Sequence, residues 1–182
     1  MNEVTILGVD PGTSVMGYSL LRTELQKTEI LICDVIKMTK LTGQMQKLKF
    51  IFDTTEALIK QYQPSILAIE APFFGKNPQS MLKLGRAQGV VITACLHHNI
   101  EVYEYSPRKI KQAITGNGNA TKEQVAAMLQ QIYKELEIPK FLDATDALAV
   151  AVCHHLQTKI NFGNNKFTGW ESFIAKNKDR IV

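Results

Sequence analysis

Residues 4–21 read VTILGVDPGTSVMGYSLL, two apolar runs on either side of an Asp-Pro-Gly step. One apolar run ends at Asp10, Pro11 and Gly12, and a second begins at about Gly17. Proline presets φ and glycine tolerates positive φ, so the Asp-Pro-Gly step is typical of a turn that follows a buried strand. Asp10 is therefore either a turn residue or a carboxylate that the protein needs at the end of that strand.

The hydrophobic pattern of the remaining chain predicts the other elements of an α/β domain. Strands are expected at 4–10, 17–22, 29–36, 65–70 and 100–105. Helices are expected at 43–62, at 80–98, after a Ser106 cap, after Thr121 with Gln124 in a capping box, and from Asp143 to about Thr158. Consecutive strands followed by mixed units predict an antiparallel start and one mixed five-stranded sheet with helices on both faces.

Length and composition favour one globular domain inside the cell. The 182 residues are 45% hydrophobic, so residues 1–158 can form a sizeable core and 159–182 a C-terminal extension. A cytoplasmic location without membrane contact is expected, since no apolar run is long enough to span a membrane and the first residues do not resemble a leader. The odd number and wide spacing of the cysteines predict reduced packing residues: Cys33, Cys95 and Cys153.

Basic residues concentrate in the middle of the chain. The net charge is +4, and residues 71–122 contain seven basic and two acidic residues. A basic zone favours binding of a polyanion such as a nucleic acid, because the phosphates that it neutralises release their counterions. A basic surface exposed to solvent, without a ligand, is the alternative.

Four acidic residues are candidate metal ligands: Asp10, Glu70, Asp143 and Asp146. Glu70 ends a predicted inner strand, and no lysine or arginine lies within five residues of it, so a buried charge there needs a partner. If the first and fourth strands are parallel neighbours, all four carboxylates meet at one sheet edge, since Asp143 and Asp146 share a helix face. Their repulsion then requires cations, and oxygen ligands favour Mg²⁺. Asp10 as a turn residue and Asp143 as an N-cap are the simpler alternatives.

Four segments carry a family resemblance: GVDPGTSVMGYSLL (8–21), AIEAPFFGKNPQSMLKLGRAQGV (68–90), EYSPRKIKQAITGNGNATKEQV (104–125) and DATDALAVAVCHH (143–155). In order and spacing they resemble the bacterial RuvC Holliday-junction resolvases over residues 4 to about 156. The resemblance implies a ribonuclease H-like fold, a homodimer and Mg²⁺. Two ions per site are expected, because two can activate a water molecule and stabilise the leaving oxygen of a phosphodiester, and Mn²⁺ is expected as a substitute. The resemblance also implies paired, symmetric nicks in four-way DNA junctions during recombination and repair, together with junction-binding and branch-migrating motor proteins.

The resemblance assigns roles to individual residues. The family's acidic metal ligands fall on the four carboxylates already singled out. Phe73 matches an aromatic residue that contacts bases at the junction centre, and Lys111 and Lys122 match two lysines at the DNA surface. Phe73 as a loop aromatic packed on the core is the alternative. The candidate DNA-binding residues are this set and its aromatic and basic neighbours: Phe73, Phe74, Lys76, Arg108, Lys109, Lys111 and Lys122.

The predicted helix at 80–98 is a candidate dimer interface, because it carries more apolar residues than one buried face needs. Gly85, Ala87 and Gly89 would let a second helix approach, and Val91 is a candidate for the outer face. A two-fold dimer would place two metal sites on symmetric strands of a junction. Coverage by the C-terminal extension, which we expect to dock as a short helix, is the alternative.

Three other functions share parts of this pattern. GVDPGTS also resembles the first phosphate loop of actin-like sugar kinases and chaperone ATPases, but the chain has no second glycine-rich phosphate loop. A ribonuclease H acting on RNA·DNA hybrids would use the same carboxylates, although it would read 2′-OH groups. A junction-binding module without catalysis would not need four acids.

Overall fold

The strands and helices predicted for residues 1–158 are all present in the computed structural model, which describes residues 3–24, 27–72, 77–134 and 142–163. The strands are β1 (Val4–Asp10), β2 (Val15–Glu24), β3 (Lys27–Lys37), β4 (Ile66–Glu70) and β5 (Glu101–Tyr105). The helices are α1 (Gln44–Tyr62), α2 (Pro78–His97), α3 (Pro107–Thr115), α4 (Lys122–Ile132) and α5 (Leu142–Gly163). The predicted α/β class is confirmed.

Two helices have bounds that differ from the prediction. α2 begins at Pro78, because the Asn77 side chain accepts a hydrogen bond from the Ser80 amide and proline fits the first turn. α5 begins at Leu142 and continues to Gly163, past the expected end at Thr158. The helix expected within the C-terminal extension falls outside the described residues, apart from this end of α5.

The sheet has the strand order β3-β2-β1-β4-β5. β1 pairs antiparallel with β2 and β2 with β3, which confirms the antiparallel start. β4 runs parallel to β1, with Val9 opposite Ile69, and β5 runs parallel to β4. The first and fourth strands are therefore parallel neighbours, and their carboxyl ends lie at the same edge of the sheet.

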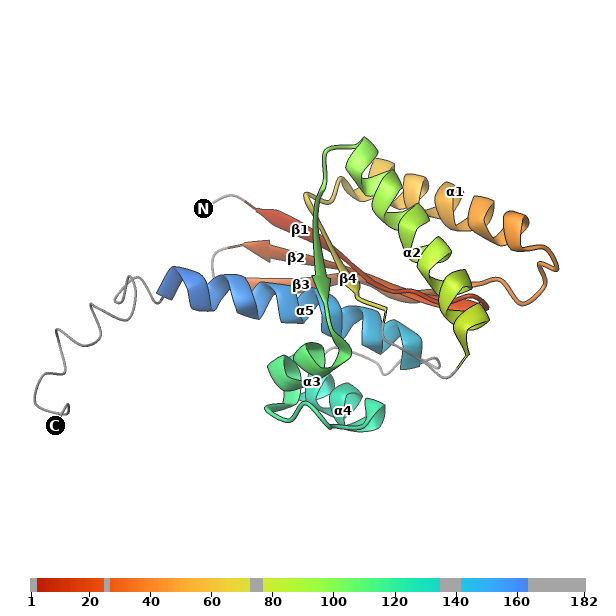
Figure 1. The fold of residues 1–182 in the computed structure, drawn as a ribbon. Coiled ribbons are helices and arrows are strands. Elements are labelled where there is room, and N and C mark those ends of the chain that lie inside the picture. The colour runs from red at the N-terminus through yellow and green to blue at the C-terminus, as the bar shows by residue number, and fades with distance from the viewer. Residues whose placement is uncertain (1–2, 25–26, 73–76, 135–141, 164–182) are drawn as a thin grey trace, which may run out of the picture.

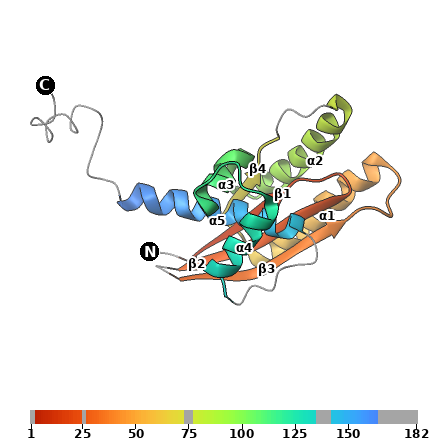
Figure 2. The same ribbon diagram turned by 90° about the horizontal axis from the view of Figure 1, so that it is seen from below.

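Helices cover both faces of this sheet (Figure 1). α1 and α2 pack on the face to which Leu7 and Val9 contribute, and α5 crosses the other face, to which Ile6 contributes. Figure 2, seen from below, shows α3 and α4 against the outer side of α5. Because side chains alternate along a strand, even-numbered positions of β1 and β4 face α5 and odd-numbered positions face α1 and α2.

Glycines allow α5 to lie very close to β1 and β2. A Cβ atom at Gly8 would lie 2.3 Å from the Ala147 carbonyl oxygen, and one at Gly17 would lie 1.8 Å from the Asp143 carbonyl oxygen. Ser19 donates a hydrogen bond of 3.1 Å to the same Ala147 carbonyl. The two glycines therefore set the distance between the sheet and the first turns of α5.

α2 has a buried face and an exposed face. Val91 is completely buried and Ala87 is 1% exposed, so the expectation that they lie on an outer face is wrong: both pack with the apolar residues of the sheet. Gly85 and Gly89 are exposed, and a Cβ atom at either would meet no heavy atom within 4 Å.

The helix caps and the thiols agree with the sequence. Ser106 caps α3 by accepting a hydrogen bond from the Lys109 amide, and Thr121 and Gln124 form the expected capping box of α4. The three cysteines are free thiols at buried or half-buried positions: Cys33, Cys95 and Cys153. Among the described residues, no helix is both long and apolar enough to cross a membrane.

Candidate active site

Asp10 and Glu70 are the last residues of β1 and β4. Both occupy even-numbered positions, so their side chains lie on the sheet face that α5 covers. The pairing of Val9 with Ile69, one residue earlier in each strand, places the two carboxylates next to each other. Asp10 is thus a strand residue with its side chain directed toward α5, and not only part of the turn that follows.

α5 brings two further carboxylates to the same edge. Asp143 lies in the first turn of α5, so it is not the N-cap, and Asp146 follows three residues later. One carboxylate oxygen from each of Asp10, Asp143 and Asp146 lies within 4.8 Å of the other two. We call these three residues the carboxylate cluster.

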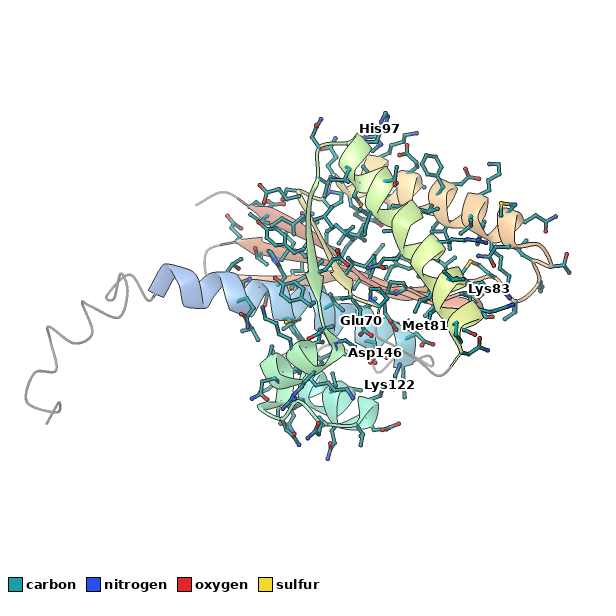
Figure 3. The ribbon with its side chains drawn as sticks, viewed as in Figure 1. Glu70, Met81, Lys83, His97, Lys122 and Asp146 are labelled. Atoms are coloured by element: carbon teal, nitrogen blue, oxygen red, sulfur yellow. The ribbon has the colours of Figure 1, made fainter. Side chains whose placement is uncertain are left out.

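Glu70 lies beside the carboxylate cluster and lines two cavities. The first, of about 270 Å³, is shared with Asp10 and Asp143, and its other lining residues are Pro11, Ala71, Pro72, Leu84, Gln88 and Lys122. The second, of about 310 Å³, is shared with Asp146, and its other lining residues are Pro107, Ile110, Lys111, Lys122, Val125 and Ala149. Figure 3 shows Glu70, Asp146 and Lys122 in one region between the sheet and the α3–α4 pair.

Three carboxyl groups of the site, those of Asp10, Glu70 and Asp146, have pKa values above their ordinary values. Burial, and then the charges of Glu70 and Asp146, raise the pKa of Asp10 to about 8. Burial and the charge of Asp146 raise the pKa of Glu70 to about 7. Burial also raises the pKa of Asp146, in spite of a neighbouring lysine. At neutral pH the site therefore cannot hold all its negative charges without a cation.

Lys122 supplies one positive charge within the site. Its ammonium group donates a hydrogen bond to Asp146 Oδ2 and lies 3.9 Å from Asp143 Oδ1. The start of α4 lies against α5, so the Lys122 side chain is directed toward the carboxylate cluster, and its predicted contact with DNA stays a prediction. These contacts and the charge of Asp10 raise the pKa of Lys122, although burial opposes the shift.

The other predicted DNA-binding residues have different positions. Lys111 is half-buried in the cavity that Glu70 and Asp146 share. Arg108 and Lys109 are exposed on α3, where the Lys109 ammonium group lies 5.1 Å from the centre of the Tyr105 ring. The remaining three lie outside the described residues: Phe73, Phe74 and Lys76.

Sequence reasoning missed Gln88, which lines the cavity shared by Asp10 and Glu70. It is 5% exposed on the buried face of α2, between Leu84 and Val91. A polar side chain in a helical series of apolar ones was the available signal, since a buried amide needs hydrogen-bond partners.

The residues present fit a hard divalent cation. Carboxylate oxygens are its usual ligands, and the carboxylate cluster offers three within reach of one ion, with Glu70 lining the same cavity. The raised carboxyl pKa values agree with a site built to be neutralised by positive charge.

The affinity of this site for a divalent cation is expected to rise with pH. Binding must displace protons from Asp10 and Glu70, whose pKa values are about 8 and about 7. Calorimetric titration with Mn²⁺ should show an affinity about 10-fold higher per pH unit for each proton released, levelling off above about pH 8. An affinity independent of pH between 6 and 8 would contradict the assignment.

Stability without divalent cations should change in the opposite direction. A carboxyl pKa raised by folding stabilises the folded state most at a pH below its ordinary value, near 4, and this contribution is lost as the pH rises through about 7 to 8. In EDTA, the unfolding temperature should therefore fall between pH 6 and 8.5, and added Mn²⁺ should reverse the fall. A rise in EDTA would contradict the shifts.

The sequence aligns with those of known proteins over nearly its whole length. The family described as Crossover junction endodeoxyribonuclease RuvC matches residues 6–154. The RuvC protein of Cytophaga hutchinsonii is 53% identical over 176 residues, which cover 97% of this chain and 87% of the relative. That of Bacteroides fragilis is 49% identical, with 100% of this chain and 97% of the relative covered.

The fold of this chain is similar to that of solved Holliday junction resolvases. T. thermophilus RuvC in complex with a Holliday junction substrate is 28% identical, with a TM-score of 0.80 over 87% of this chain and 96% of that one. The yeast mitochondrial Holliday junction resolvase Ydc2 is 15% identical, with a TM-score of 0.63 over 87% and 82% of the two chains, and shows the fold alone. The predicted ribonuclease H-like fold is confirmed. The family match includes all four carboxylates, and the chain belongs to the RuvC family of crossover junction endodeoxyribonucleases.

Proposed function

We propose that this protein resolves four-way DNA junctions by metal-dependent hydrolysis of phosphodiester bonds during homologous recombination and repair. The observation that carries the proposal is the carboxylate cluster with Glu70 beside it, at the shared end of two parallel strands, in a chain of the RuvC family. We propose Mg²⁺ as the ion, two per site, with Mn²⁺ as a substitute, because every candidate ligand is a carboxylate.

Each side chain has a role in this proposal. A divalent cation held by Asp10, Asp143 and Asp146 would supply an activated water molecule and stabilise the leaving oxygen. Glu70 contributes a fourth carboxylate from the wall of the cavity. Lys111 faces the cavity that Glu70 and Asp146 share, where its positive charge can orient the phosphate group.

The proposal is tested by offering three labelled substrates with Mg²⁺: a four-way junction, a linear duplex and an RNA·DNA hybrid. We expect paired cuts at symmetric positions of the junction and little cleavage of the other two. Preferential cleavage of the hybrid would support a ribonuclease H instead. Binding of the junction without any cleavage in Mg²⁺ or Mn²⁺ would leave a binding module as the function.

Arg108 and Lys109, the exposed basic residues of α3, are proposed to contact DNA phosphates. Arg108→Ala and Lys109→Ala are each expected to weaken binding of junction and duplex alike, and to lower the slope of log affinity against log salt by about one unit. Fluorescence anisotropy at several salt concentrations measures both quantities. Lys49→Ala is the control, because Lys49 is exposed on α1, on the opposite face of the sheet. Unchanged slopes for both α3 variants would contradict the assignment.

A homodimer through the exposed face of α2 is part of the proposal. Leu82 is 65% exposed and Leu96 is 57% exposed, and both lie on the face where Gly85 and Gly89 leave room for a second helix. A two-fold dimer would use this surface twice and hold two active sites on the symmetric strands of a junction. We also propose that the dimer acts in the cytoplasm with junction-binding and branch-migrating motor proteins.

Leu82→Glu and Leu96→Glu are each expected to shift the protein from dimer to monomer at micromolar concentration, because each would bury an unpaired charge in the interface. Sedimentation velocity measures the shift. Ile132→Glu is the matched control, since Ile132 is 49% exposed on α4, on the other side of the sheet. An unmodified protein that sediments as a monomer, and cuts one strand per junction, would contradict the dimer.

A further inference from the structure

Gln88 is a buried polar residue on the apolar face of α2. Its neighbours on that face, such as Ala87 and Val91, are almost completely buried and pack against the sheet. An amide at such a position is costly unless its hydrogen bonds are made. The Gln88 Nε2 atom donates one hydrogen bond of 2.8 Å to Glu104 Oε2 and a longer one of 3.4 Å to the backbone carbonyl of Glu70. The side chain therefore connects α2 with β4 and β5.

The hydrogen bond from Gln88 to the Glu70 carbonyl lies at the end of β4, where the pairing of β4 with β1 stops. β1 ends at Asp10, and the last paired residues of β1 and β4 are Val9 and Ile69. On the other side, the Ala71 amide donates a hydrogen bond of 2.9 Å to the Tyr105 carbonyl. The Glu70 carbonyl and the Ala71 amide belong to one planar peptide unit. This unit is held by β5 at its nitrogen and by Gln88 at its oxygen.

The orientation of this peptide unit bears directly on the Glu70 side chain. Rotation about the Cα–C bond of Glu70 moves the peptide plane relative to the side chain, so a fixed plane limits where the carboxylate can lie. Gln88 also lines the cavity into which Glu70 and Asp10 project. Residues that do not bind the metal themselves can orient a metal ligand by hydrogen bonding to it. The Gln88 amide is placed to do so for Glu70, through the Glu70 backbone carbonyl.

We infer that Gln88 is a positioning residue that fixes the Glu70 carboxylate against the carboxylate cluster through the Glu70–Ala71 peptide. The inference deepens the proposed function, because it rests on Glu70 as a ligand of that site. This role requires no contact between Gln88 and the reacting groups. It acts only by holding Glu70, and Glu104 holds the Gln88 amide in the orientation that reaches the peptide.

The test compares Gln88→Met with Gln79→Met. Methionine has nearly the shape of glutamine but donates no hydrogen bond, and Gln79 is an exposed residue of the same helix. We expect Gln88→Met to weaken Mn²⁺ binding about 10-fold in calorimetric titration, the scale typical of a lost supporting partner. The kcat for junction cleavage should fall to a similar extent, with KM unchanged, and Gln79→Met should match the unmodified protein.

A double-mutant cycle with Glu70→Gln separates positioning from general damage to the fold. If Gln88 acts through Glu70, then Gln88→Met will cause no further loss of Mn²⁺ affinity in the Glu70→Gln background. Glu104→Ala, which removes the second partner of the amide, should weaken Mn²⁺ binding in the same direction by a smaller factor. Additive losses in the cycle would overturn the inference.

The two proposals fail in distinguishable ways. If Glu70→Gln leaves both Mn²⁺ affinity and cleavage unchanged, the metal site itself is wrong. If Glu70→Gln abolishes cleavage but Gln88→Met binds Mn²⁺ as the unmodified protein does, only the role of Gln88 is wrong. Should Gln88→Met unfold, Gln88→His, which can still donate a hydrogen bond, should restore folding and bind Mn²⁺ more tightly than Gln88→Ala. Equal affinities for these two variants would also overturn the inference.

Discussion

Asp143→Asn and Glu70→Gln are each expected to lower the rate of junction cleavage by about 10³-fold while junction binding stays close to that of the unmodified protein. Replacing a carboxylate by an amide removes the charge that holds the cation, whose stabilisation of the transition state is worth several kcal/mol, at about 1.4 kcal/mol per factor of ten. Neither change removes a phosphate contact, and the loss of a negative charge favours DNA binding. Single-turnover cleavage and anisotropy measure the two quantities.

Asp53→Asn is the matched control for these two variants. Asp53 is exposed on α1 and pairs only with Lys49 four residues earlier among the contacts described, a kind of ion pair that contributes little. Its cleavage rate should equal that of the unmodified protein. Near-normal cleavage by Asp143→Asn or Glu70→Gln would end the metal-site assignment, because each carboxylate lines the same cavity as Asp10.

Gly17→Ala is expected to damage the site through the fold. Its Cβ would lie 1.8 Å from the Asp143 carbonyl oxygen, which belongs to the helix backbone and can move only with α5. Overpacking of this kind costs about 1–3 kcal/mol, and it should push Asp143 away from Asp10. We expect a lower unfolding temperature in a thermal melt. We also expect Mn²⁺ affinity to fall more than it does in other variants that are destabilised to the same extent.

Gly43→Ala provides the comparison for that variant. Gly43 precedes α1 with an extended backbone, and a Cβ there would meet the Gln46 side chain at 3.6 Å, an ordinary contact distance. Its Mn²⁺ affinity should be unchanged, although replacing a glycine N-cap by alanine can cost about 1 kcal/mol of stability. A Gly17→Ala protein with normal Mn²⁺ affinity would show that α5 can shift without moving its carboxylates.

The sequence predicted the parts of the site that depend on local pattern and strand order. Asp10 and Glu70 each follow an apolar run, and parallel pairing of those runs is sufficient to bring the two residues together. Asp143 and Asp146 share a helix face through their spacing alone. The family resemblance then assigned the same four residues without further geometry.

The features that the sequence did not predict depend on packing between distant segments. Asn77 and Ser80 are both good cap residues, and only the observed hydrogen bond shows that Asn77 caps α2. Lys122 reaches the carboxylate cluster because α4 packs beside α5, a contact that no local pattern encodes. Val91 could face either way on a helix with two apolar sides, and the sheet buries it.

The close packing of α5 on Gly8 and Gly17 divides the candidate active site into a rigid half and an adjustable half. The Asp143 and Ala147 carbonyls, one helical turn apart, lie against the strands that carry and flank Asp10, so the carboxylate cluster moves as one body with the sheet. Glu70 belongs to the same sheet through β4, whereas Lys111 and Lys122 approach the cluster from α3 and α4, which pack beside α5. Adaptation to new junction sequences is thus expected to accumulate in the adjustable half, while residues 8, 10, 17, 143 and 146 stay fixed.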